Sequence, residues 1–335
     1  MQLLSPKIVV AGAGSIGCFV GGQLAAAGHD VRFLARRRIA EELAAHGLTV
    51  SDREGGESRL APDKLALASG PGVFAGADVI LVTVKSGATR EIGASIREFA
   101  PAGAVVVSLQ NGVDNAAILA EALPGRTVVA GMVPFNVAAL GQGRFHRGTD
   151  GTIVIDAKAA ALAASLTTPH LPIATHPDML AVAWGKLLLN LNNALNALSG
   201  LPLREQLADR AWRRLLASCI AEALVALNAA GIRPAKIGVL PPWLLPKVLR
   251  LPDALFRLVA SAQIKIDPKA RTSMADDLTQ RRTTEIDQLQ GQVVALAAAQ
   301  GTAAPTNRAV RDRVKTAEQK GAGSPRLSAA EVAAG

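Results

Sequence analysis

The chain has 335 residues, of which 50% are hydrophobic and only 3% are aromatic. This length suggests about two domains, and the apolar content is ample for buried cores, which excludes a largely disordered chain. The net charge is +9, but lysine and arginine are spread along the chain, without a zinc motif or alternating basic and aromatic residues. We therefore expect no nucleic-acid partner.

The cysteines and the apolar runs indicate the compartment. Cys18 and Cys219 lie far apart in apolar helical patterns, so we expect buried thiols and not a disulfide framework. No signal peptide precedes the first apolar run, and no apolar run reaches membrane-spanning length. These features predict a cytoplasmic protein with no membrane partner.

A β-branched run at residues 7–11 leads directly into the motif Gly12-Ala-Gly14-Ser15-Ile16-Gly17, after which the chain turns helical. Gly12 permits a tight turn, Gly14 lets the backbone approach a pyrophosphate, and Gly17 lets the helix pack closely on the strand. The N–H groups of the first helical turn, including Ser15 and Ile16, can then bind phosphate. The motif alone is weak, but a strand before it and a helix after it predict a dinucleotide site.

The end of the second strand, at residues 31–34, predicts which nucleotide binds. An acidic residue at this point selects NAD by binding the ribose 2′-hydroxyl, whereas an arginine pairs with the 2′-phosphate of NADP. The strand runs into Arg36-Arg37-Arg38, and no carboxylate follows until Glu41. Guanidinium groups suit a phosphate dianion. We therefore expect NADP(H), with Arg36 as the main contact.

Apolar runs and helical stretches alternate as far as about residue 170. This alternation predicts an α/β fold with a Rossmann-type, doubly wound parallel sheet. Further strands are predicted at 79–84, 104–108 and 127–132. Residues 47–69 predict an irregular connection with short strands, and residues 141–155 predict antiparallel strands that close the sheet.

Polar residues follow two of these strands. Lys85 comes directly after the strand at 79–84, and Gln110-Asn111-Gly112 follows the strand at 104–108. Ligands of doubly wound sheets bind at the carboxyl ends of the strands. We expect Lys85 and Asn111 to face the nicotinamide, although each taken singly is more often a surface lysine or a turn asparagine.

The rest of the chain is predicted to be helical. The predicted helices cover 178–198, 203–230, 272–300 and 304–319. The expected domains are a nucleotide-binding domain at 1–175, a helical substrate or dimerisation domain at 176–320, and a disordered tail at 321–335, which is small and polar.

The first of these helices carries Lys186 and Asn190, four residues apart and therefore on one face. A lysine within a leucine-rich sequence is costly to bury, so it either reaches solvent or has a functional partner. The helix also has a surplus of asparagine at 190, 192, 193 and 196, which helix propensity disfavours. Some of these amides are expected to bond within a polar site.

These residues resemble the ketopantoate reductase (2-dehydropantoate 2-reductase) family over nearly the whole chain to about residue 320. The shared pieces are the glycine-rich turn with Arg36, Lys85, Gln110-Asn111-Gly112, Trp184-x-Lys186-Leu-x-x-Asn190, and Ser273-Met followed by Thr284-Glu285-Ile-Asp287. The last two pieces are the specific ones, because the glycine-rich turn fits many dehydrogenases.

The resemblance implies reduction of 2-dehydropantoate to (R)-pantoate with NADPH, in pantothenate and coenzyme A synthesis. It implies that Lys186 is the general acid and that Glu285 binds the substrate hydroxyl and holds Lys186. It places Asn111, Asn190 and Ser273 on the substrate, and Lys85 between nicotinamide and substrate. A homodimer is a possible assembly.

The chain departs from the family pattern at Ala194, where the family often has a second helical asparagine. This departure leaves the 2-oxo acid open, so the alternative is an NADP-dependent reductase of another branched 2-oxo acid. A second alternative is a non-catalytic protein that senses NADP(H). The pair of Lys186 and Glu285 favours catalysis, because a sensor would not need it.

Overall fold

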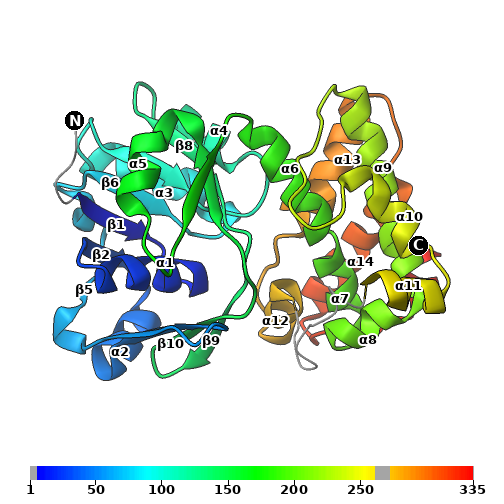
Figure 1. Ribbon diagram of the computed structural model, residues 1–335, viewed down its shortest axis with the longest axis horizontal. Helices are drawn as coiled ribbons and strands as arrows, with labels where there is room; N and C mark the ends of the chain where they lie inside the picture. The colour runs from blue at the N-terminus through cyan, green and yellow to red at the C-terminus, as the bar shows by residue number, and fades with distance from the viewer. Residues whose placement is uncertain (1–5, 261–271, 335) are drawn as a thin grey trace. The chain divides into compact units, whose positions relative to one another are not determined.

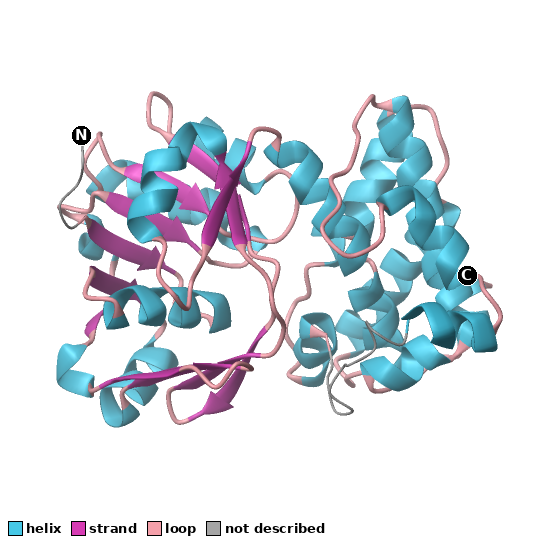
Figure 2. Cartoon of the chain, in the orientation of Figure 1, coloured by secondary structure: helices cyan, strands magenta, loops and turns pink. Residues whose placement is uncertain are grey.

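The computed structural model describes residues 6–260 and 272–334. The chain folds as two compact units, Met1–Met179 and Leu180–Gly335. All strands of the described residues belong to the first unit, and the second is built from helices and loops (Figures 1 and 2). Within the described residues, no helix is both long and apolar enough to cross a bilayer.

The first unit is built on an eight-stranded sheet in the order β12-β11-β8-β7-β6-β1-β2-β5. Its strands are β1 (Lys7–Ala11), β2 (Asp30–Leu34), β5 (Ala66–Ala68), β6 (Val79–Val82), β7 (Val105–Ser108), β8 (Val128–Met132), β11 (Ile153–Asp156) and β12 (Ile173–His176). All neighbouring strands pair in parallel, except that β8 and β11 pair with each other in antiparallel fashion. The predicted doubly wound parallel sheet is therefore confirmed. From β1 the order runs outward through β2 on one side and β6 on the other, which makes the β1–β6 boundary the topological switch point.

A second, four-stranded sheet has the order β4-β3-β10-β9. Its strands are β3 (Leu48–Asp52), β4 (Glu57–Leu60), β9 (Val137–Gly141) and β10 (Arg144–Arg147). The expectation that residues 141–155 close the main sheet is therefore right for β11 and wrong for β10. β10 instead pairs in parallel with β3 and antiparallel with β9. Alternating polarity predicts a strand but not its partner, which explains the error.

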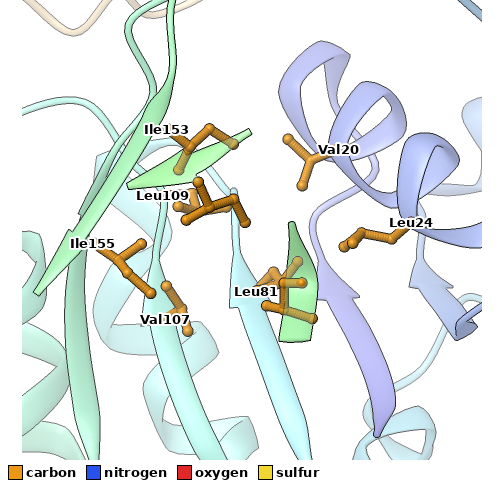
Figure 3. Close-up of a pocket in the computed structure, with 9 residues that line it drawn as sticks. Val20, Leu24, Leu81, Val107, Leu109, Ile153 and Ile155 are labelled. Carbon is orange, nitrogen blue, oxygen red and sulfur yellow. The ribbon is translucent and has the colours of Figure 1, made fainter. Parts of the chain in front are cut away.

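Helix α1 (Ser15–Ala26) packs closely on both sheets. A Cβ atom at Gly21 would lie 2.5 Å from the Phe33 ring of β2, and one at Gly22 would lie 2.8 Å from Val50 of β3. Figure 3 shows Val20 and Leu24 of α1 on the side that faces the main sheet. The cavity between α1 and the main sheet is about 10 Å³ and has an apolar lining, so it is a packing gap and not a ligand site.

Side chains of the main sheet alternate between two apolar cores. In β1, Ile8 and Val10 belong to the core that contains α1, whereas Val9 and Ala11 belong to the core on the opposite face. The other helices of this unit are α2 (Arg37–His46), α3 (Thr89–Phe99), α4 (Asn115–Ala122) and α5 (Ala160–Leu166). Because β1 is buried on both faces, the chain that leaves its carboxyl end starts from a fixed position.

The helices of the second unit are shorter than the sequence predicts. They are α6 (Met179–Asn190), α7 (Asn192–Ser199), α8 (Leu203–Ala208), α9 (Arg210–Ala229), α10 (Leu245–Leu249), α11 (Asp253–Ala260), α12 (Ser273–Thr279), α13 (Gln290–Ala299), α14 (Pro305–Lys320) and α15 (Ala329–Ala333). The predicted helix 178–198 is interrupted at Leu191, and the helix 203–230 at Asp209, whose carboxylate caps α9. The helix predicted over 272–300 is divided by the segment 280–289, and 304–319 matches α14.

The segment expected to be a disordered tail also contains a helix. Ser328 and Glu331 form a capping box at the start of α15, in which each side chain binds the other's backbone N–H. Val332 is fully buried. The capping box and this one apolar contact stabilise a helix within a composition that is otherwise typical of a tail.

Candidate functional site

The glycine-rich turn has the backbone geometry of a phosphate-binding turn. Gly12 has φ +116°, a backbone conformation that favours glycine. The Thr83 hydroxyl donates to the Gly12 carbonyl at 2.7 Å and so helps to hold the turn between β1 and α1. A Cβ at Gly17 would lie 2.1 Å from the same carbonyl, so α1 starts as close to the strand as a backbone can. A Cβ at Gly14 would meet nothing within 4 Å, which leaves open space above the turn.

The N-terminus of α1 presents backbone donors to this space. Gly14 is the N-cap, and no side chain of the described residues caps the helix there. The first turn, from Ser15 to Gly17, contains no acidic residue. Unsatisfied N–H groups and the positive end of the helix dipole together favour an anion such as a pyrophosphate.

Arg36 differs from the two arginines that follow it. Arg37 Nε lies 2.7 Å from Glu41, and an Arg38 Nη lies 3.4 Å from Glu42. Arg36 is the exposed N-cap residue of α2, just beyond β2, and makes no ion pair with the described residues. Of the three guanidinium groups, Arg36 is therefore the one placed to receive a phosphate.

Lys85 and Asn111 lie at neighbouring strand ends, as the sequence predicts. Lys85 follows β6 and Asn111 follows β7, and these two strands pair in parallel. Both residues are exposed. They lie on the opposite side of β1 from Arg36, because β2 and β6 flank β1. A dinucleotide whose adenosine ribose lies at Arg36 would extend its other half toward Lys85 and Asn111.

In the second unit, Lys186 is half-buried on α6 among the buried residues Trp184, Leu187 and Leu188. Burial disfavours the charged amine and lowers the pKa of Lys186 from 10.5 to about 8. Asn190 lies one turn further on the same helix and is also half-buried. An ammonium with this pKa can give up a proton near neutral pH.

A buried amide binds the backbone at the break after Asn190. The side-chain amide of Gln290, which is fully buried, donates to the Leu191 carbonyl at 2.8 Å. This bond holds the carbonyl where α6 gives way to α7. Ala194 therefore lies on a separate helix from Asn190 and is fully buried.

Two of the surplus asparagines hold the helical unit together. The side-chain amides of Asn192 and Gln206 form two hydrogen bonds, of 3.1 and 2.9 Å. Asn196 donates to the Leu201 carbonyl at 2.9 Å and accepts from the Thr272 N–H at 3.1 Å. Asn192 and Asn196 thus bond within the helical unit, and the expectation of a polar site at Asn190 stays a prediction.

Ser273 and Glu285 lie at the ends of short helical segments. Ser273 is the exposed first residue of α12, next to the capping residue Thr272. Glu285 is half-buried and precedes the 3₁₀ turn Ile286–Gln288, so its predicted position within a long helix is wrong. The segment around Glu285 is fixed to α14, because the Thr284 N–H donates to Glu318 at 2.6 Å.

The expected residues divide between the units. The first unit carries the predicted nucleotide contacts, which are Gly12, Gly14, Ser15, Ile16, Gly17, Arg36, Lys85 and Asn111. The second carries Lys186, Asn190, Ser273 and Glu285. Sequence reasoning missed Gln290 and a buried polar cluster beneath Lys85 and Asn111, because buried amides carry no motif of their own.

Family comparisons agree with this division. The model described as "Ketopantoate reductase PanE/ApbA" matches residues 8–159, and its C-terminal counterpart matches residues 178–318. The chain belongs to the ketopantoate reductase family. This is a family of oxidoreductases, and the two matched ranges correspond to the α/β unit and the helical unit.

Relatives of this family member span its length. A 2-dehydropantoate 2-reductase of Halobacterium salinarum is 28% identical over 94% of this chain and all of its own length. A PanE/ApbA family ketopantoate reductase from Ralstonia eutropha is 29% identical, with a TM-score of 0.80 over 94% of this chain and 99% of its own. A D-mandelate dehydrogenase, solved with NADH and anilino(oxo)acetate, has a TM-score of 0.79 over 94% of this chain and 99% of its own, at 20% identity, and shares the fold.

The lowered pKa of Lys186 predicts how this amine reacts. Below about pH 8 it is charged, and above that pH it is neutral and nucleophilic. Competitive acylation followed by peptide mass spectrometry should therefore show Lys186 gaining reactivity with a midpoint near pH 8. A midpoint at the ordinary lysine value of 10.5 would contradict the burial that the structure shows.

Proposed function

We propose that this protein reduces the 2-oxo group of 2-dehydropantoate to the hydroxyl of (R)-pantoate, with NADPH as the hydride donor. The observation that carries the proposal is the half-buried Lys186, whose pKa of about 8 suits a general acid. The family match supports the reaction class.

Bound NADPH would supply the hydride for the carbon of the 2-oxo group, and reduction of that carbon places negative charge on the carbonyl oxygen. The Lys186 ammonium stabilises this charge and transfers one proton to the oxygen, which leaves a neutral amine and an alcohol. A lowered pKa makes the ammonium a stronger acid than an exposed lysine would be. The amine then takes a proton from water before the next turnover.

The other residues of the helical unit hold the substrate. Glu285 accepts a hydrogen bond from the substrate hydroxyl and keeps Lys186 in place. Asn190 follows Lys186 by one turn of α6 and donates to the substrate, and Ser273 binds its carboxylate. In the α/β unit, Asn111 contacts both substrate and nucleotide, and Lys85 lies where the two meet.

Arg36 supports NADP(H) over NAD(H). Its two neighbours are paired with glutamates, and it is the exposed arginine at the end of β2. The first acidic residue after β2 is Glu41, which already pairs with Arg37. A ribose 2′-hydroxyl would thus find no free carboxylate here, whereas a 2′-phosphate would find a guanidinium.

A second candidate is reduction of another branched 2-oxo acid by the same mechanism. Ala194 favours it, because the family often has an asparagine at this position and this chain has an alanine. The discriminating test is turnover of a panel of 2-oxo acids that differ in branching and in their hydroxyl group. Glu285 would lose its proposed partner in a substrate without the hydroxyl.

Replacement of Arg36 by Ala should weaken NADPH binding by at least about tenfold, since a charge-assisted pair to the 2′-phosphate is lost. NADH binding should stay within about twofold, because NADH has no such phosphate. Fluorescence titration of both nucleotides checks this. Arg37→Ala is the matched control, since Arg37 is exposed and already paired with Glu41. Equal losses for both nucleotides, or an equal effect of the control, would contradict the assignment.

Replacement of Glu285 by Gln should lower kcat/KM for the 2-oxo acid by about 10²-fold, because the carboxylate that holds substrate and Lys186 is lost. NADPH affinity should not change. Asp287→Asn is the control, because Asp287 lies two residues away and pairs with Lys315 at 2.9 Å. Steady-state kinetics measure the first effect and nucleotide titration the second. A variant that loses nucleotide affinity and keeps kcat/KM would remove Glu285 from the substrate site.

A further inference from the structure

We propose that Thr89, Gln110 and Asn115 form a positioning network that fixes the loops of Lys85 and Asn111, and that this network sets affinity for the nicotinamide half of the nucleotide alone. The proposal rests on the proposed function in one respect, that the ligand is a nicotinamide dinucleotide. Thr89, Gln110 and Asn115 are 1%, 8% and 3% exposed. All three side chains are therefore too buried to contact a ligand directly.

Gln110 joins the two strand ends. Its side-chain amide donates to the Val84 carbonyl at 3.0 Å and to the Thr89 hydroxyl at 2.8 Å. Its amide oxygen accepts from the Ser108 hydroxyl at 3.1 Å. One side chain after β7 thus binds the backbone just before Lys85 and the first residue of α3.

Thr89 and Asn115 complete the connection. The Thr89 hydroxyl lies 2.7 Å from the Asn115 amide oxygen and 2.8 Å from the Ser86 carbonyl, so it donates to one of these two acceptors. The Asn115 amide donates to the Ser86 hydroxyl at 3.0 Å and to the Asn111 carbonyl. The Ser86 hydroxyl donates to the same carbonyl at 3.0 Å. The backbone of Asn111 is therefore held by two side chains.

The position of this network in the sheet decides which half of the nucleotide it serves. The bonds of Gln110 to Val84 and Thr89, and those of Asn115 to Thr89 and Ser86, join the segment after β6 to the segment after β7, on one side of the switch point. Arg36 and β2 lie on the other side of β1, and the glycine-rich turn follows β1 itself. A dinucleotide laid across β1 meets the network only at the end opposite to the adenosine.

Because its members are buried and polar, the network fixes the positions of the loops that carry Lys85 and Asn111. Apolar packing would tolerate small shifts of a loop, whereas each of these bonds requires a narrow distance and angle. Loss of one partner leaves other buried groups unsatisfied, so the loops rearrange to bind water or each other. The backbone positions from which the exposed side chains of Lys85 and Asn111 extend are then no longer fixed.

The test compares two nucleotides and two replacements of Thr89. Thr89→Val keeps the side-chain shape and removes the hydroxyl, whereas Thr89→Ser keeps the hydroxyl. We expect Thr89→Val to weaken NADPH binding by about tenfold. It should leave binding of adenosine 2′,5′-bisphosphate, which lacks the whole nicotinamide half, within about twofold of the wild type. Thr89→Ser should restore NADPH binding to within about threefold. Isothermal titration measures all of these affinities.

Equal weakening of the two nucleotides would overturn the proposal, because the network would then support the fold in general. Unchanged NADPH affinity in Thr89→Val, or failure of Thr89→Ser to restore it, would also overturn it. Asn115→Asp is the second variant, since it keeps the oxygen facing Thr89 and removes the donor to Asn111. It should show the same split between nucleotides, in which NADPH binds more weakly and the nucleotide without the nicotinamide half does not. Loss of folding in both variants, seen as loss of the thermal transition, would likewise count against a positioning role.

These binding measurements need no 2-oxo acid, which separates this proposal from the proposed function. A protein that shows the split but does not reduce 2-dehydropantoate would support the network and overturn the reaction. A protein that reduces 2-dehydropantoate without the split would do the opposite.

Discussion

Helix α1 packs so closely on both sheets that its closest contact positions admit only glycine, and the nucleotide half of the protein depends on that constraint. Gly21 and Gly22 let the helix approach the main sheet and the small sheet, and Gly17 lets it start directly against the Gly12 carbonyl. The N-terminus of α1 is thereby fixed at the carboxyl end of β1, beside the switch point. The same close packing that stabilises the fold places the backbone donors where phosphates bind.

In the helical unit, the corresponding constraint is the burial of Lys186. Burial lowers the pKa of the amine to about 8 and so makes a surface-type residue into a usable acid. Gln290 donates to the Leu191 carbonyl directly after the end of α6, and the buried Ala194 follows on α7. Amide side chains therefore have two different roles in this unit. Asn190 is a proposed substrate residue, and Gln290 binds the backbone where its helix ends.

Local sequence signals predicted the parts of the structure that local physics determines. The glycine spacing predicted the tight turn at Gly12, which has a positive φ, and the apolar runs predicted the parallel strands. The second sheet was missed because β3 and β10 are separated by almost a hundred residues and polarity does not identify a partner. The interruption at Leu191 was also missed; it lies where Gln290, from a distant part of the sequence, binds the backbone. Glu285 was recognised from its motif, but its place before a 3₁₀ turn follows from contacts with α14 that no local pattern records.

The proposed role of Lys186 as the acid in an NADPH-dependent reduction of 2-dehydropantoate is tested most directly by single-turnover oxidation of NADPH. The rate is followed against pH with 2-dehydropantoate for the wild type and for Lys186→Met. We expect a wild-type rate that falls above about pH 8, and a variant slower by about 10²-fold or more with no such fall. A variant that keeps the wild-type rate and pH profile would contradict this role.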